Sequence, residues 1–195
     1  MTLSRRHFLG GAAGFGLFSH QAAAKSQNNQ DYPPVFETTR YQYTLLQPVL
    51  PLTPTTLTDR KGKPATLAPA PGRVMLINIW ATWCAACNTE MPLLEKLHHE
   101  LGHKLSIAAV STDRISHERV DDWLETRAIR SLPVFLDPEA KLASSAPASS
   151  APLRADKMPT TYLITADGLI TGYMPGEADW LSPEGRRLLA YYGVR

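Results

Sequence analysis

The chain has 195 residues, of which 44% are hydrophobic, and its 20 basic and 18 acidic side chains leave a formal net charge of +2. This length suits one compact domain with its own core, and we expect a monomer. The near balance of charge excludes the strongly basic surface of a nucleic-acid-binding protein, so no nucleic-acid partner is predicted.

The first 24 residues have the features of an export signal. Residues 4–9 read Ser-Arg-Arg-His-Phe-Leu, which resembles a twin-arginine signal. Residues 10–18 are apolar but rich in glycine, and too few to span a bilayer as a helix. Small residues end at Ala24, so we predict cleavage there and a periplasmic protein; a disordered basic tail is the competing interpretation. Without residues 1–24 the basic and acidic side chains number 18 each.

The domain is predicted to span residues 51–195, after a linker over 25–50 that includes a candidate edge strand. That strand is expected at Tyr41–Leu45, where apolar and polar residues alternate. Prolines are expected to break the chain after it, at Pro48, Pro51 and Pro54. The polar residues 57–64 then predict a turn between two short strands.

The only two cysteines lie where a buried strand is predicted to become a helix. Residues 74–80 are apolar on both alternating faces, which predicts a strand covered on both sides. A helix follows, with leucines on one face and Gly102 at its end. The unpaired N–H groups and the dipole of that helix would stabilise a thiolate at Cys84, and Cys87 is near enough to resolve a mixed disulfide.

Two other interpretations of the cysteines stay open. A purely structural disulfide would close so short a loop that it would constrain the unfolded chain little. A zinc site could use Cys84, Cys87, His99 and His103, whose spacing approaches that of a zinc finger. A straight helix would place His99 roughly 18 Å from Cys87, a reach that is hard for one zinc site to close.

The second half of the chain continues the alternation of strands and helices. Residues 105–110 and 133–136 predict further buried strands, and an amphipathic helix between them is marked by Val120, Trp123, Leu124 and Ala128. Asp167-Gly168 predicts a hairpin, and Ser182-Pro183 the start of a last helix. Residues 139–156, rich in Ser, Ala and Pro, predict a flexible spacer without core residues, or alternatively a lid.

The motif Trp-Ala-Thr-Trp-Cys-Ala-Ala-Cys at residues 80–87 resembles the active site of TlpA/ResA-like thiol-disulfide oxidoreductases of the thioredoxin superfamily. Pro92, residues 158–164 (Met-Pro-Thr-Thr-Tyr-Leu-Ile) and Gly176 match further family positions. The resemblance implies an α/β thioredoxin fold, with a central mixed sheet flanked by helices and an N-terminal β-hairpin extension. The chain departs from thioredoxin at Asn78, which replaces a buried aspartate, and from the usual proline between the cysteines at Ala85-Ala86.

The resemblance also implies site residues and partners. Catalytic roles fall to Cys84, Cys87, Glu90 and a cis Pro159, and substrate binding to Trp83 and Met158; for Glu90, an exposed helix glutamate is the alternative. Electrons would pass through the sulfurs, so neither an organic cofactor nor a metal is expected. The expected partners are a disulfide-bearing protein substrate and a membrane electron-donor thiol protein. The expected function is disulfide reduction in cytochrome c maturation or copper-centre assembly; the alternatives are a periplasmic thiol oxidant and a copper carrier.

Overall fold

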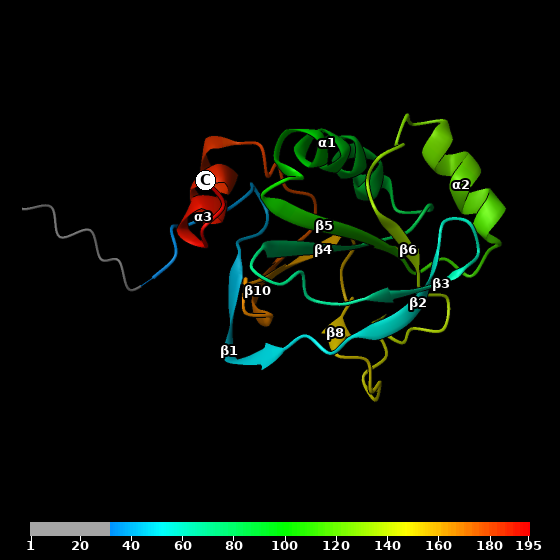
Figure 1. The fold of residues 1–195 in the computed structure, drawn as a ribbon, viewed down its shortest axis with the longest axis horizontal. Coiled ribbons are helices and arrows are strands. Elements are labelled where there is room, and N and C mark those ends of the chain that lie inside the picture. The colour runs from blue at the N-terminus through cyan, green and yellow to red at the C-terminus, as the bar shows by residue number, and fades with distance from the viewer. Residues whose placement is uncertain (1–31) are drawn as a thin grey trace, which may run out of the picture. The chain divides into compact units, whose positions relative to one another are not determined.

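The computed structural model describes residues 32–195, whose strands form one main sheet (Figure 1). Its strand order is β1-β10-β9-β4-β5-β6-β2-β3, and β7 pairs separately with β8. The predicted export signal lies outside the described residues. The strands are β1 Thr44–Pro51, β2 Thr55–Asp59, β3 Pro64–Leu67, β4 Val74–Trp80, β5 Leu105–Ser111, β6 Val134–Leu136, β7 Ala143–Ser144, β8 Leu153–Arg154, β9 Thr160–Ile164 and β10 Leu169–Pro175; the helices are α1 Ala85–Leu101, α2 His117–Glu125 and α3 Pro183–Tyr191.

Strand β4 is the centre of the sheet, as its apolar sequence predicts. It pairs in parallel with β5 and antiparallel with β9, and all of its residues are buried. Leu76 and Trp80 belong to the hydrophobic cluster on one face of the sheet, whereas Ile77 and Ile79 belong to the cluster on the other face. A strand buried on both faces needs apolar side chains at every position, which explains its continuous apolar run.

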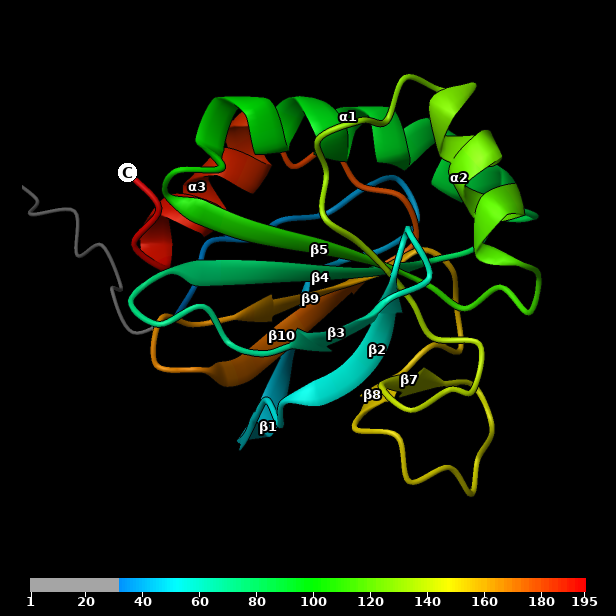
Figure 2. The same ribbon diagram turned by 45° about the vertical axis from the view of Figure 1, so that its right-hand side comes forward.

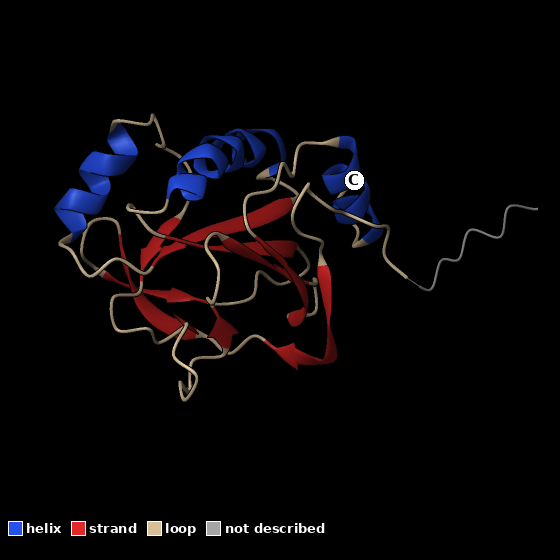
Figure 3. Cartoon of the chain, turned by 180° about the vertical axis from the view of Figure 1, so that it is seen from behind, coloured by secondary structure: helices blue, strands red, loops and turns tan. Residues whose placement is uncertain are grey.

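The three helices of the described region lie on one side of the sheet (Figures 2 and 3). Each buries an apolar stripe in the same cluster, with Leu94, Leu124 and Leu188 as examples. The helix boundaries follow the predicted signals at Cys84, Gly102 and Ser182, which are the caps. The α2 prediction is too long, however, because Ala128 has a positive φ of 57° and lies beyond the helix end at Glu125.

The edge strand is real but lies further along the chain than predicted. β1 covers Thr44–Pro51, pairs with β10, and has a register irregularity between Leu45 and Leu50. The strand runs through Pro48, but its pairing with β10 is interrupted between Leu45 and Leu50, so the expected break occurs in the pairing and not in the strand. A strand at the edge of a sheet tolerates proline, because one row of its N–H groups has no partner strand. The predicted start of the domain at residue 51 stays a prediction. Most of β1 precedes that residue, yet the strand already pairs with β10 of the main sheet.

The prediction of a flexible spacer without core residues over 139–156 is also wrong. Leu142 and Leu153 are at most 1% exposed and pack in the second cluster, on the sheet face away from the helices. Asp137 accepts backbone hydrogen bonds from Lys141, Leu142 and Ala143 at 2.7, 2.9 and 3.0 Å. Most residues of this segment are Ser, Ala or Pro, but burial of the Leu142 and Leu153 side chains anchors it against the sheet.

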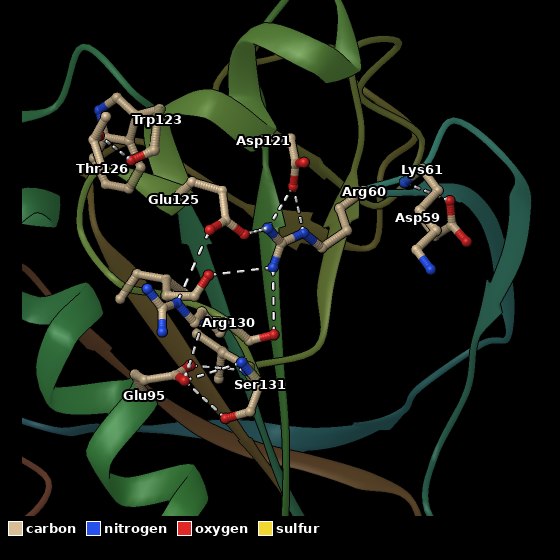
Figure 4. Close-up of polar contacts among 12 residues, drawn as sticks. Asp59, Arg60, Lys61, Glu95, Asp121, Trp123, Glu125, Thr126, Arg130 and Ser131 are labelled. Atoms are coloured by element: carbon tan, nitrogen blue, oxygen red, sulfur yellow. Dashed lines mark hydrogen bonds and ion pairs between the residues drawn. The ribbon is translucent and has the colours of Figure 1, made fainter.

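Charged side chains join the β2–β3 hairpin to α2, and α1 to the loop before β6 (Figure 4). Arg60, in the hairpin turn, donates to Asp121 at 2.5 Å, to Glu125 at 3.0 Å and to the Ile129 carbonyl at 3.2 Å. These bonds tie the hairpin to α2. The predicted hairpin is present as β2 and β3, and β2 also pairs with β6.

Glu95 accepts four hydrogen bonds in this region (Figure 4). Its carboxylate accepts the backbone N–H groups of Arg130, Ser131 and Leu132 at 3.2, 3.0 and 2.8 Å, and the Ser131 hydroxyl at 2.8 Å. Burial acts to raise the pKa of Glu95, but the bonds from Ser131, Leu132 and Arg130 outweigh it and lower that pKa to about 2. An ionised Glu95 therefore anchors the loop that precedes β6.

Candidate functional site

Cys84 and Cys87 form a disulfide where β4 leads into α1. Their Cα atoms are 5.3 Å apart. Cys84 is the N-cap of the helix, and its Sγ accepts the backbone N–H of Cys87 at 3.2 Å. Cys84 is 6% exposed and Cys87 is fully buried. A thiolate formed at Cys84 would thus receive an N–H group and the positive end of the helix dipole, while being the more accessible sulfur of the pair.

The loop before Cys84 is held by Asp113, a residue that the sequence analysis did not single out. The buried carboxylate of Asp113 accepts the Thr82 backbone N–H at 2.8 Å and the Thr82 hydroxyl at 2.9 Å. It also accepts the Ser111 hydroxyl at 2.8 Å. Asp113 follows β5, which pairs in parallel with β4, so both strands end at this edge of the sheet. In the sequence, the one signal for Asp113 is its position: it is an acidic residue just after a strand that is predicted to pair in parallel with the strand leading to Cys84.

Trp83 and Met158 border the same hollow as Cys84. This hollow has a volume of about 670 Å³ and opens beside the start of α1. Trp83 is 71% exposed at its rim. The Met158–Pro159 peptide bond is cis, as the resemblance implied. The structure thus brings Trp83, Cys84 and Met158 together around one open space.

Glu90 is buried rather than exposed, so the exposed-glutamate alternative is wrong. It lies one turn beyond Cys87 on α1 and is 1% exposed. Its carboxylate accepts the Asn78 side-chain amide at 2.7 Å and the Ala178 backbone N–H at 3.2 Å. Burial outweighs these hydrogen bonds and raises the pKa of Glu90 to about 8. Asn78 also donates to the Thr161 hydroxyl at 2.8 Å, which links the acid to the residues after Pro159.

The zinc alternative needs His99 near the cysteines. His99 lies instead in the last turn of α1, where its Nε2 is 3.2 Å from Glu95 Oε1 and 3.1 Å from Ser131 Oγ. Within residues 32–195, no group of three or more His, Cys, Asp or Glu side chains is close enough to hold a metal ion. The described geometry around the cysteines is that of a disulfide at the start of α1, with the buried acid Glu90 one turn further along the helix.

Comparison with known proteins identifies the family. The sequence profile of the AhpC/TSA family matches residues 51–173. The chain belongs to the AhpC/TSA family. That match contains both cysteines, Glu90 and Pro159, whereas α3 lies beyond it.

Curated relatives carry names that agree with the resemblance drawn from the motif, which is thereby confirmed. The thioredoxin-like protein YneN of Bacillus subtilis is 32% identical over 111 residues, 56% of this chain and 60% of YneN. The thiol-disulfide oxidoreductase ResA of Bacillus cereus is 30% identical over 122 residues, 62% of this chain and 65% of ResA. The thiol:disulfide interchange protein DsbE of Xylella fastidiosa is 34% identical over 106 residues, 54% and 48% of the two chains. The chain thus spans about half to two thirds of the length of these relatives.

Solved structures confirm the predicted thioredoxin-like fold for this AhpC/TSA member. A thiol:disulfide interchange protein of the thioredoxin family from Chlorobium tepidum superimposes with a TM-score of 0.58 at 20% identity, covering 74% of this chain and 97% of that one. A DsbF homologue from Corynebacterium diphtheriae gives 0.59 at 19% identity, covering 80% and 95%. These likenesses concern the fold alone.

Proposed function

We propose that the protein is an exported thiol-disulfide oxidoreductase that reduces protein disulfides through Cys84 and Cys87. The observation that carries the proposal is the asymmetry of the pair: Cys84 caps a helix at the edge of a hollow, and Cys87 lies buried behind it. An accessible sulfur can attack a substrate, and a shielded one can resolve the product. The names of the relatives ResA and DsbE support the same chemistry.

The reaction begins from the dithiol form. The Cys84 thiolate attacks one sulfur of the substrate disulfide, forms a mixed disulfide and releases one substrate thiolate, which takes up a proton. Cys87 then loses its proton and attacks Cys84 Sγ, which forms the Cys84–Cys87 disulfide and releases the second substrate thiol. Two electrons have passed to the substrate, and the disulfide form is the one that the structure contains. A thiol protein of the membrane would return two electrons to the pair.

Met158 and Trp83 would bind the substrate. An extended substrate segment could form hydrogen bonds with the backbone of Met158, since this residue precedes a proline and borders the same hollow as Cys84. Trp83 would cover the reacting sulfurs with an apolar rim, because most of its side chain is exposed there. Pro159 contributes by lacking an N–H group at this position.

Glu90 is proposed to exchange protons with the cysteine pair. A pKa of about 8 keeps Glu90 largely protonated at neutral pH, so that it can give up or regain a proton during exchange. We expect Glu90→Gln, which cannot release a proton, to slow disulfide exchange at pH 7 at least about tenfold and to remove the titration near pH 8. Stopped-flow rates between pH 5 and 10 measure both effects.

The stability of Glu90→Gln provides the control. Because the folded-state pKa of Glu90 is raised above its ordinary 4.5 to about 8, its contribution to stability is fully present below pH 4.5 and is lost as the pH rises through 8. Urea unfolding of Glu90→Gln should lack this fall. Glu100→Gln, an exposed change on the same helix, should leave both profiles as in the wild type. An unchanged exchange profile in Glu90→Gln would leave Glu90 a structural residue.

The proposed cellular role is reductive and depends on the resemblance. The substrate would be a disulfide-bearing protein of cytochrome c maturation or copper-centre assembly, and the protein would act as a periplasmic monomer exported by the twin-arginine route with cleavage near Ala24. Within residues 32–195, no helix combines the length and the apolar composition needed to cross a membrane.

A reduction potential tests the direction of electron flow. Equilibration of the purified domain with glutathione or dithiothreitol, read by thiol alkylation, should give a value near that of thioredoxin, about −270 mV. A value near that of a strong periplasmic oxidant, about −120 mV, would support the oxidant alternative instead. Copper retained on purification, with no exchange activity, would favour the carrier.

A further inference from the structure

The hollow beside Cys84 has a second wall that the motif does not explain. Its near wall is the start of α1 with Trp83 and Cys84, and its far wall is the β7 segment, residues 143–146. Figure 2 shows β7 and β8 apart from the main sheet, on the side away from α1. Eight of the sixteen lining residues are alanine or serine: Ala85, Ala86, Ala140, Ala143, Ser144, Ser145, Ala146 and Ala155. Side chains this small leave about 670 Å³ open, a volume in the range of binding pockets for organic ligands.

Arg154 holds this far wall in place. Its guanidinium donates to the carbonyls of Ala146 and Ser145 at 2.7 and 3.2 Å. It also pairs with Asp156, with one nitrogen 2.5 Å from a carboxylate oxygen. Ser144 Oγ accepts the Ala146 N–H at 3.1 Å, and β7 pairs with β8. A planar guanidinium that bonds two carbonyls and a carboxylate at once restrains the backbone of residues 143–146. We therefore describe this segment as a fixed wall of the hollow and not as a moving lid.

The charged side chains that line the hollow indicate which ligand groups it could bind. The carboxylate of Asp137 accepts three backbone N–H groups, and that of Asp156 pairs with Arg154. Arg114 lines the same space, is exposed, and has no ion-pair partner within residues 32–195. The hollow is therefore roomy and lined by small side chains, and in the described part of the chain it has Arg114 at its side as a cation without an ion-pair partner and Asp137 as a carboxylate that only backbone N–H groups solvate.

We propose that residues 143–146, clamped by Arg154, select substrates for the cysteine pair. The hollow would take an extended peptide with a bulky side chain beside its reactive cysteine and an acidic residue in reach of Arg114. This rests on the proposed disulfide exchange and adds the class of substrate. A large side chain would fill the alanine-lined space and bury apolar surface there, whereas glycine would leave it empty.

The test compares short disulfide-linked peptides with a small disulfide. Peptides that carry tryptophan or glycine beside the cysteine, and hydroxyethyl disulfide, are each reduced by the purified domain in its dithiol form. We expect kcat/KM for the tryptophan peptide to exceed that for the glycine peptide about tenfold. Glutamate in the peptide, in place of lysine, should raise kcat/KM about threefold, and Arg114→Gln should cancel this difference.

Filling the hollow should remove the preference. In Ala146→Phe, kcat/KM for the tryptophan peptide should fall about tenfold, while that for hydroxyethyl disulfide stays unchanged. Ala148→Phe, in the same exposed segment but outside the lining, is the matched control and should behave as the wild type. If Ala146→Phe does not fold, Ser145→Phe takes its place. Arg154→Ala, which frees the wall, should also lower the preference.

Two outcomes overturn different statements. Equal rates for the tryptophan and glycine peptides in the wild type, or an unchanged tryptophan-peptide rate when the hollow is filled, would overturn the selecting wall and leave disulfide exchange intact. A wild-type domain that reduces none of the three substrates would instead overturn the proposed function.

Discussion

Replacing Cys87 with alanine is expected to leave the protein covalently joined to its substrates. Cys84 can still attack a substrate disulfide, because it is the sulfur at the edge of the hollow. The chain has no third cysteine, so the mixed disulfide has no internal exit. Turnover should fall about a thousandfold or more. Acid-quenched periplasmic extracts on non-reducing gels should show high-mass bands that disappear when reductant is added.

Cys84→Ala is the matched control for this experiment. It also abolishes turnover, but it should trap little, because the remaining Cys87 is fully buried. The complexes trapped by Cys87→Ala should be few, and should include a membrane thiol protein and either a metalloprotein assembly factor or an apocytochrome. Recovery of many unrelated secreted proteins would favour the oxidant alternative. Recovery of none would argue that the pair is not an exchange site.

Glu95→Ala is expected to lower the free energy of unfolding by about 3 kcal/mol. The carboxylate accepts four hydrogen bonds from residues 130–132, and its removal leaves the buried N–H of Leu132 and the part-buried N–H groups of Arg130 and Ser131 without this partner. For a chain of this size, the loss corresponds to a fall in Tm of roughly 6–12 °C. Urea unfolding at pH 7 followed by circular dichroism measures it. The site residues are untouched, so exchange rates below the transition should stay near those of the wild type.

The pH dependence of stability provides an independent check on Glu95. Its pKa is lowered from 4.5 to about 2, so its stabilisation is present above pH 4.5 and is lost as the pH falls toward 2. The wild type should lose about 3 kcal/mol from this group over that range, and Glu95→Ala should not. Glu100→Ala, on the same helix, removes only surface ion pairs with Lys96 and with Arg186 of α3, and should cost less than about 1 kcal/mol. Equal losses in the two variants would contradict the anchoring role of Glu95.

Much of the fold follows from the sequence, because its elements are coded locally. The uninterrupted apolar run of 74–80 predicts a strand buried on both faces, and β4 is such a strand. Asp167-Gly168 and Ser182-Pro183 carry their own turn and cap chemistry, and a hairpin and a helix form there. The cysteine pair at a strand-to-helix junction likewise needs only neighbours in the chain. Signals of this kind act over a few residues, so one sequence contains them completely.

The tertiary structure alone decided how distant polar groups meet. Glu95, Asp113 and Glu90 are all glutamates or aspartates in ordinary sequence positions, yet one anchors a loop, one holds the turn before Cys84, and one is buried with a raised pKa. Each role depends on donors supplied from residues far away in the chain, which no local pattern records. Residues 139–156 show the same limit: their composition predicts a loose spacer, whereas Leu142 and Leu153 find buried places against the sheet. The free energy of those contacts depends on which side chains pack against the two leucines, and that is known only from the folded structure. The same packing positions residues 143–146 as the second wall of the hollow beside Cys84.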